Sequence, residues 1–143
     1  MADLRVAGAN ALGAAELYEL LRLRVDVFVV EQECAYPELD GRDLEPGTRH
    51  FWVHDGVPVA YLRTLAEPDG TVRIGRVCTA KQARGLGHGR RLMVAALDEV
   101  GVRTCVLDAQ TYVVDFYASF GFMVEGDEFI EDGIPHRRMR RSP

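Results

Sequence analysis

The stretch "KQARGLGHGRRLM", residues 81–93, constrains the fold more than any other part of the chain, because Gly85, Gly87 and Gly89 interrupt the start of a helical pattern. A glycine inside a helix costs about 1 kcal/mol relative to alanine, so these glycines need a backbone reason. The preceding segment 71–80, "TVRIGRVCTA", has strand character. A strand, a glycine-rich turn and a helix form the arrangement in which free helix N–H groups bind a phosphate. We therefore predict an anion-binding loop here.

The rest of the sequence predicts strands and helices around this loop. Residues 14–31 repeat apolar side chains at helical spacing, and residues 32–48, rich in proline and glycine, have the pattern of a long loop. The other expected elements are a hairpin over 49–65 that turns at Asp55-Gly56, a helix over 87–100, a strand over 102–110, a short helix within 112–122 that Gly121 ends, and two short strands joined at Asp132-Gly133. A chain of 143 residues has room for a single domain, residues 1–143.

The charge of the chain is uneven along its length. The formal net charge is -5, and residues 31–45, "EQECAYPELDGRDLE", alone hold six carboxylates against Arg42. The balanced remainder gives no electrostatic reason to expect a nucleic-acid or membrane partner. No apolar run reaches the roughly 20 residues of a membrane span, and the first residues do not have the pattern of a secretion signal. We therefore expect a cytoplasmic protein.

The cysteines and histidines do not have the spacing of a metal site. Cys34, Cys78 and Cys105 contain no C-x-x-C pair, and His50 and His54 lie in an expected strand, where four positions span about 13 Å. We expect reduced, packed cysteines and no metal.

The glycine stretch does not fit the two common phosphate motifs. The pattern G-x-x-x-x-G-K-[ST] is absent, and G-x-G-x-x-G fails because Arg90 stands where the last glycine belongs. Residues 82–87, "QARGLG", instead resemble the Q/R-x-x-G-x-G/A signature of the GNAT superfamily of N-acetyltransferases, and "FYASFGF" resembles its F-Y-x-x-x-G-F segment. The runs "FVVEQ", "LDAQ" and "DGIPH" resemble the ElaA-like branch, although Asp108 stands where that branch often has asparagine. The resemblance covers nearly the whole chain.

This resemblance implies a fold and a co-substrate. The fold would be α/β (α+β), with a central mixed, mostly antiparallel twisted sheet of about six to seven strands, flanked by helices and splayed between the fourth and fifth strands. The co-substrate would be acetyl-CoA, with its pyrophosphate on the backbone amides of residues 84–89. The cofactor-binding residues would be Val77, Cys78, Thr79, Gln82, Arg84, Gly85, Leu86, Gly87, His88, Gly89, Arg90 and Gln110.

Acetyl transfer from a thioester to an amine needs a neutral amine, a stabilised oxyanion and a proton for the leaving thiolate. The resemblance implies that Tyr117 supplies the proton and that a backbone N–H of Val77 or Cys78 meets the oxyanion. Without the resemblance, Tyr117 equally fits a place in the core. A lysine-like amine has a solution pKa near 10.4, so a base must accept its proton. The candidates are Glu31, His50 and His136.

We expect direct transfer in a ternary complex, because a thiol in an apolar strand with no adjacent base is a poor nucleophile. The acceptor would be a primary amine of a small molecule or a peptide, drawn as a cation by Glu38, Asp40 and Asp43. A homodimer is a further possibility. Two other classes fit the sequence: a sensor that binds acyl-CoA without turnover, and a partner-binding domain without a cofactor. Tyr117 favours the enzyme, and the glycine stretch weighs against the partner-binding domain.

Overall fold

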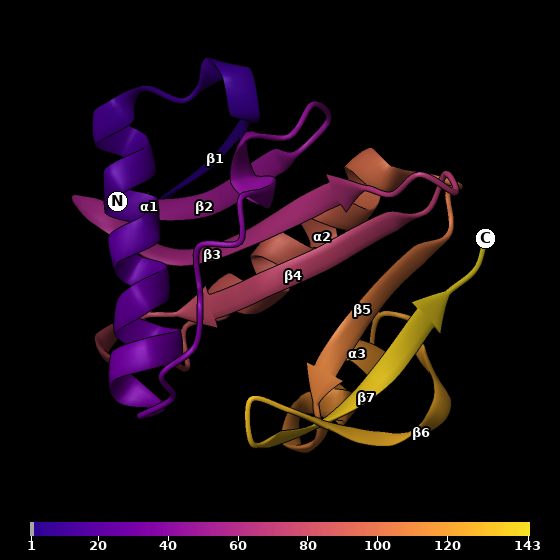
Figure 1. Cartoon of the computed structure of the whole chain (residues 1–143). Helices are drawn as coiled ribbons and strands as arrows, with labels where there is room; N and C mark the ends of the chain where they lie inside the picture. The colour runs from indigo at the N-terminus through magenta and orange to yellow at the C-terminus, as the bar shows by residue number, and fades with distance from the viewer. Residues whose placement is uncertain (1) are drawn as a thin grey trace.

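The computed structural model describes residues 2–143, which form a seven-stranded sheet with helices on both faces (Figure 1). The strand order is β1-β2-β3-β4-β5-β7-β6, and each neighbouring pair is antiparallel except the parallel pair β4 and β5. The strands are β1 (Asp3–Gly8), β2 (Arg49–Asp55), β3 (Val57–Ala66), β4 (Val72–Thr79), β5 (Cys105–Gln110), β6 (Met123–Glu131) and β7 (Ile134–Arg141). The expected mixed, mostly antiparallel sheet is confirmed.

Two predicted turns join the hairpins. Gly56, with a φ of 75°, lies at the tip between β2 and β3. Asp132 and Gly133 join β6 to β7 with φ angles of 51° and 76°. Positive φ at both central residues is what a two-residue hairpin loop of this kind requires, which explains the Asp-Gly sequence.

Three helices cover the sheet. Helix α1 (Ala14–Val25) lies across one face, and α2 (His88–Val100) and α3 (Val114–Ala118) lie on the other (Figure 1). A π-helical turn over Asp26–Glu31 extends α1, so the helical stretch ends at the predicted residue. Short 3-10 turns occupy Ala9–Ala11, Arg42–Leu44, Lys81–Ala83 and Thr111–Val113.

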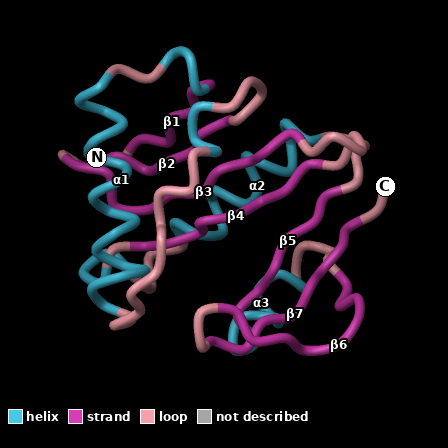
Figure 2. The backbone as a smooth tube through the Cα atoms, viewed as in Figure 1, coloured by secondary structure: helices cyan, strands magenta, loops and turns pink. Residues whose placement is uncertain are grey.

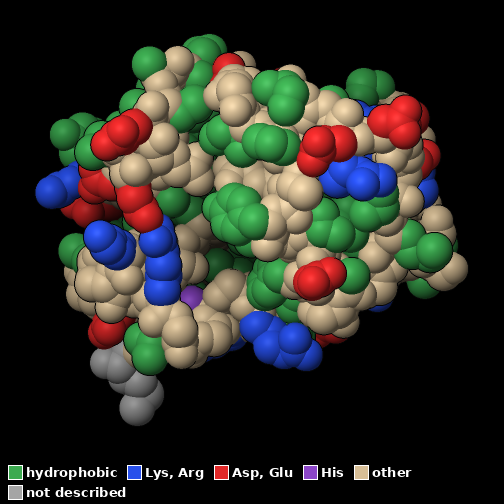
Figure 3. All heavy atoms as spheres, turned by 90° about the horizontal axis from the view of Figure 1, so that it is seen from below, with side chains coloured by type: hydrophobic (Ala, Val, Ile, Leu, Met, Phe, Trp, Pro, Cys, Tyr) green, Lys and Arg blue, Asp and Glu red, His purple; other side chains and the backbone are tan. Residues whose placement is uncertain are grey.

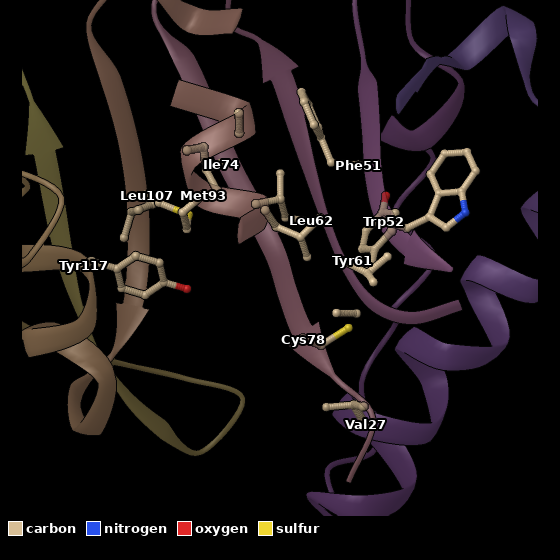
Figure 4. Close-up of a cluster of buried hydrophobic side chains, with 14 of the residues drawn as sticks. Val27, Phe51, Trp52, Tyr61, Leu62, Ile74, Cys78, Met93, Leu107 and Tyr117 are labelled. Atoms are coloured by element: carbon tan, nitrogen blue, oxygen red, sulfur yellow. The ribbon is translucent and has the colours of Figure 1, made fainter. Parts of the chain in front are cut away.

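The core lies on both faces of the middle of the sheet. Most of β3 is buried because α1 and α2 cover it from opposite sides. Helix α2, expected over residues 87–100, faces the sheet with Leu92, Met93, Ala96 and Val100, which are buried, and with Ala95, which is partly buried. Figure 4 shows part of this cluster, which extends from α1 to β5.

Residues 32–48 return across the α1 face of the sheet (Figure 2). Side chains of this segment bond to β3 through Arg63 and to β4 through Arg76. The long loop predicted from proline and glycine is therefore an ordered cover over the two central strands.

Candidate functional site

The parallel strands β4 and β5 separate soon after they pair. Within residues 2–143 their ladder consists of Val72 with Cys105 and Arg73 with Val106, so β4 diverges from β5 from residue 74 onward. This confirms the predicted splay. A cavity of about 900 Å³ occupies the opening, with walls from both strands, α3, residues 27–42 and the β6–β7 turn. Its size is typical of a small-molecule site.

The glycine loop connects the carboxyl end of β4 to α2 at the edge of this cavity. Gly85 and Gly87 both have a φ of 80°, and a Cβ added at either one would have no atom of residues 2–143 within 4 Å. Gly89 is helical, and its missing Cβ would lie 3.5 Å from an aromatic ring of α3. The Arg91 N–H donates to the Gly87 carbonyl and closes the first turn, so the N–H groups of residues 88–90 can bind a ligand.

Arg84 anchors this loop to the π-helical turn that follows α1. Its Nη1 and Nη2 atoms each donate to a carboxylate oxygen of Glu31 at 2.6 Å, and its Nε donates to the Thr79 carbonyl at 3.1 Å. The hydrogen bonds from Arg84 lower the pKa of Glu31 below its ordinary value. A carboxylate in this state is a weak base, so Glu31 is better suited to holding the loop than to deprotonating a substrate.

Tyr117 lies on α3 and lines the cavity. Its ring packs edge-to-face against Phe116 and Phe122, with centroids 5.1 and 6.4 Å away, and the residue is 8% exposed. Figure 4 shows its hydroxyl directed toward β4 across the opening. Burial raises the pKa of Tyr117 well above that of an ordinary tyrosine, so the hydroxyl is protonated and able to donate at neutral pH.

Cys78 lies on β4 and also lines the cavity. Burial raises the pKa of its thiol to about 12. Because the thiolate is the nucleophilic form, this cysteine is not activated for covalent catalysis.

His136 lies on β7 and lines the cavity beside the end of β5, where it is paired in register with Gln110. Its Nδ1 lies 2.7 Å from the Ile134 carbonyl, an acceptor, so Nδ1 must carry the proton. The Nε2 of the neutral ring is then a proton acceptor. The ring is stacked on Phe129, with centroids 5.7 Å apart, which fixes its plane.

His50 lies away from the cavity, in the interior of the protein. It is 0% exposed, with Nδ1 2.6 Å from the Tyr61 hydroxyl and Nε2 3.0 Å from the Asp43 carbonyl. Burial lowers the pKa of His50. The structure thus separates His50 from the other two base candidates and gives it a structural role.

Three carboxylates of residues 32–48, those of Glu38, Asp40 and Asp43, are paired with arginines of α1, β3 and β4. Arg24 of α1 is fully buried and donates to Glu38 at 2.7 Å and to Asp43 at 2.6 Å. Burying a charge is costly unless it is paired and hydrogen-bonded in this way. This cluster of Arg24, Glu38 and Asp43 holds residues 32–48 against α1.

Two further arginines complete the cluster. Arg63 of β3 donates to Asp40 and Asp43, and Arg76 of β4 donates to Glu38 and Asp40. With Arg24, three arginines therefore balance the three carboxylates that we expected to attract a cation. The face of the molecule seen from below in Figure 3 also has acidic and basic side chains next to each other.

Asp108 also has an arginine partner on each side. It accepts from Arg73 of β4 at 3.2 Å and from Arg138 of β7 at 3.4 Å. An asparagine at this position would lack the negative charge that pairs with the two arginines. Asp108 thus ties three strands together near the closed end of the splay.

The structure brings most of the predicted residues together. Those that line the cavity are Glu31, Val77, Cys78, Thr79, Arg84, Gly89, Gln110, Tyr117 and His136. The other loop residues lie at or near the surface beside it: Gln82, Gly85, Leu86, Gly87, His88 and Arg90. Three cavity residues that the sequence did not indicate are Tyr36, Arg73 and Arg76. Arg73 and Arg76 belong to β4, the strand that leads into the glycine loop, and this position could have identified them from the sequence. No sequence pattern indicated Tyr36.

Two general features of the described residues bear on the function. Among residues 2–143, no helix is long and apolar enough to cross a membrane. In the same range, no group of three or more histidine, cysteine, aspartate or glutamate side chains is arranged to hold a metal ion.

Known proteins share this sequence and fold. A model of the acetyltransferase (GNAT) domain matches residues 13–143. A UPF0039 protein of Mycobacterium tuberculosis is 55% identical over 143 residues, which cover 96% of this chain and 92% of that protein. The ElaA protein of Escherichia coli is 41% identical over 145 residues, 92% of this chain and 91% of that protein. The crystal structure of an acyl-CoA N-acyltransferase from Pseudomonas aeruginosa matches with a TM-score of 0.93 at 41% identity, covering 99% of this chain and 100% of that one.

The glycine loop, the splayed strands and these similarities agree with one another. They show that the chain belongs to the GNAT acetyltransferase family, in its ElaA-like branch.

Proposed function

We propose that this protein is an acetyl-CoA-dependent N-acetyltransferase that moves an acetyl group to a primary amine by direct transfer in a ternary complex. The observation that carries the proposal is the cavity between β4 and β5, which extends from the glycine loop to Tyr117 and His136. Family membership supports acyl transfer from acyl-CoA. A sensor that binds acyl-CoA without turnover is the alternative.

The glycine loop fits the pyrophosphate of acetyl-CoA. The open space above Gly85 and Gly87 leaves room for phosphate oxygens, and the N–H groups at the start of α2 can donate to them. The pantetheine arm would then enter the opening between β4 and β5, which places the thioester between Tyr117 and Cys78.

The chemistry needs one base, one acid and one oxyanion donor. In this scheme the Nε2 of His136 accepts the proton of the ammonium, and the neutral amine attacks the thioester carbonyl. A backbone N–H of Val77 or Cys78 stabilises the oxyanion. The carbon–sulfur bond then breaks, and the thiolate takes the proton of Tyr117. The attacking nitrogen loses its second proton to the resulting tyrosinate, directly or through water, which leaves a neutral amide and restores the phenol. The protonated thiol of Cys78 supports direct transfer over an acetyl-enzyme.

The acceptor is a primary amine of a small molecule or a peptide, which arrives as a cation at neutral pH. Attraction by Glu38, Asp40 and Asp43 no longer supports this choice, because these carboxylates are paired. The cavity lining as a whole is also balanced, with five acidic residues and five arginines. Selection among amines would therefore depend on the placement of individual groups. The charged residues are Glu31, Asp40, Asp108, Glu131, Asp132, Arg42, Arg63, Arg73, Arg76 and Arg84.

A thiol-release assay against a panel of amines tests the proposal. Amine-dependent release of CoA from acetyl-CoA is the expected result. If acetyl-CoA raises the melting temperature but no amine promotes release, the sensor is the better description. If acetyl-CoA neither binds nor raises the melting temperature, a partner-binding domain without a cofactor replaces both.

Gly87→Val should weaken the binding of acetyl-CoA by about 10-fold or more, the loss expected when one charge-assisted hydrogen bond is broken. A φ of 80° is poorly accessible to a β-branched residue, and the new side chain would occupy the space at the loop. Calorimetry measures the change. Gly56→Val is the matched control, because Gly56 has a φ of 75° and open surroundings in a hairpin away from the cavity. Affinity equal to that of the parent would remove the loop from the site.

His136→Gln should lower kcat/KM for the amine and remove the limb of the pH profile that reports an essential base. Glutamine keeps a polar side chain but cannot take up the proton. The control is His54→Gln, since His54 lies near the end of β2 away from the cavity. An unchanged pH profile in His136→Gln would exclude this residue as the base.

A further inference from the structure

Arg76 has an unusual backbone conformation for a strand residue. Its φ is 55°, which makes it one of three non-glycine residues with positive φ among residues 2–143. A residue with a Cβ is disfavoured in this left-handed region. Gly75, its neighbour, could adopt the conformation at no steric cost, yet Gly75 is not left-handed. A specific interaction must therefore hold Arg76 in place.

This conformation is part of a β-bulge in the section of β4 that lies beyond its pairing with β5. Two residues of β4, Arg76 and Val77, face one residue of β3 between the pairs formed by Tyr61 and Arg63. The bulge lies where β4 has already left β5, so the edge of β4 that would face β5 here faces the cavity instead. A bulge re-aims the backbone around it, and here that backbone carries the proposed oxyanion donors.

The guanidinium of Arg76 is held at its far end. Its Nε donates to Glu38 Oε2 at 2.9 Å, and its Nη2 donates to the Glu38 carbonyl at 3.0 Å and to Asp40 at 3.4 Å. It also lies over the Tyr36 ring, 5.8 Å from the centroid. Glu38 is itself buried and bonded to Arg24, so the anchor is rigid.

We propose that Arg76 is a positioning residue for acyl transfer, whose bonds to Glu38 and Asp40 hold the left-handed bulge and so aim a backbone N–H of Val77 or Cys78 at the thioester carbonyl. This inference rests on the proposed function. It gives the segment that covers β3 and β4 a part in the reaction, because the anchor for the bulge comes from that segment. It also explains why an arginine occupies a position whose backbone conformation suits glycine.

The variant Arg76→Gly separates positioning from folding. Glycine adopts a φ of 55° without strain, so the chain can still fold with the bulge, but glycine also accepts other conformations, so without the anchor the direction of the neighbouring N–H groups is no longer fixed. The readout is the ratio of two dissociation constants, for acetyl-CoA and for S-ethyl-CoA, a thioether that lacks the carbonyl. The parent should prefer acetyl-CoA by about 5-fold, the contribution of one hydrogen bond. In Arg76→Gly this ratio should fall to about one. The kcat should fall about 10-fold, which is less than the loss expected when an oxyanion donor is removed completely, because the N–H group is still present but no longer held in position.

Two further variants complete the test. Arg76→Asn, which also tolerates the left-handed region, should behave like Arg76→Gly and serves if the glycine variant folds poorly. Arg49→Gly, which removes an exposed ion pair on β2, should keep both the ratio and kcat. A purely structural Arg76 predicts a lower melting temperature with the parent's ratio and kcat, and that result would overturn the inference. So would a parent that binds both ligands equally. A parent that binds neither would remove the proposed function itself.

Discussion

Tyr117→Phe is expected to lower kcat by about 10²-fold or more, the range for losing a positioned general acid. Phenylalanine keeps the ring that packs edge-to-face on Phe116 and Phe122 and removes only the hydroxyl. The dissociation constant for acetyl-CoA and the melting temperature should therefore change little. Steady-state kinetics with the best amine of the panel, together with calorimetry, measure the three quantities. Tyr18→Phe is the control, because Tyr18 is 69% exposed on α1.

The donor thiol provides the sharper comparison. A more acidic thiol leaves with less help, so Tyr117→Phe should be less impaired with an acetyl donor of that kind than with acetyl-CoA. Equal impairment with both donors would mean that Tyr117 positions the substrate, and the acid role would be abandoned. Normal turnover with both would place Tyr117 in the core alone.

The raised pKa of Tyr117 also predicts a pH dependence. Burial favours the neutral phenol, so the proton stays on Tyr117 at pH values where an ordinary tyrosine loses it. If Tyr117 supplies the alkaline limb of the kcat profile, that limb should lie above about pH 10, the ordinary value for tyrosine. A limb at lower pH would belong to another group.

Arg24→Met should reduce the free energy of unfolding by up to about 3–5 kcal/mol, because it removes one of the two arginine partners of each of the buried carboxylates Glu38 and Asp43. Methionine fills much of the volume of the fully buried arginine, so the loss reports charge more than packing. Glu38 and Asp43 keep bonds to Arg76 and Arg63, which limits the loss. Urea unfolding measures the change, and the melting temperature should fall by roughly 10–20 °C.

The control for this prediction is Arg49→Met. Arg49 also donates two hydrogen bonds to one carboxylate, that of Glu99, but both side chains are about 40% exposed. An exposed pair of this kind contributes about 0–1 kcal/mol. If the two variants lose similar stability, burial of the Arg24 cluster has no special energetic role.

The Arg24→Met effect should also depend on pH. In the parent, burial opposes and the Arg24 hydrogen bond favours the ionised form of Asp43, with the net result that its pKa lies below the ordinary 3.8. This group therefore adds stability above about pH 4 that is lost as the pH falls further. Without Arg24, burial favours the protonated form of Asp43, so mildly acidic pH removes the cost of a buried charge from the variant. The difference between parent and variant should be smaller at about pH 4.5 than at pH 7, and a constant difference would contradict this account.

Several features of the fold could be predicted because they depend on a few neighbouring residues. Asp55-Gly56 and Asp132-Gly133 mark their turns because glycine, and to a lesser degree aspartate, accepts positive φ. Gly85 and Gly87 are likewise both left-handed. The resemblance then supplied the splay between β4 and β5, which the local pattern of either strand does not contain.

Other features depend on residues far apart in the sequence. The pattern of residues 32–48 gave an acidic loop, but it could not show that Arg24, Arg63 and Arg76 meet its carboxylates, since these partners come from three different elements. His50 had the chemistry of a base, but β2 places it in the interior with both ring nitrogens bonded.

The sequence by itself determined the local elements, the glycine loop and the family, because helical periodicity, turn residues and short motifs act over a few positions. The tertiary structure alone decided which charges are neutralised, which histidine reaches the cavity and where β4 bulges at Arg76. These outcomes depend on strand register and on the return path of residues 32–48 across the sheet. They are set by contacts between distant segments, and such contacts form only when the chain has folded.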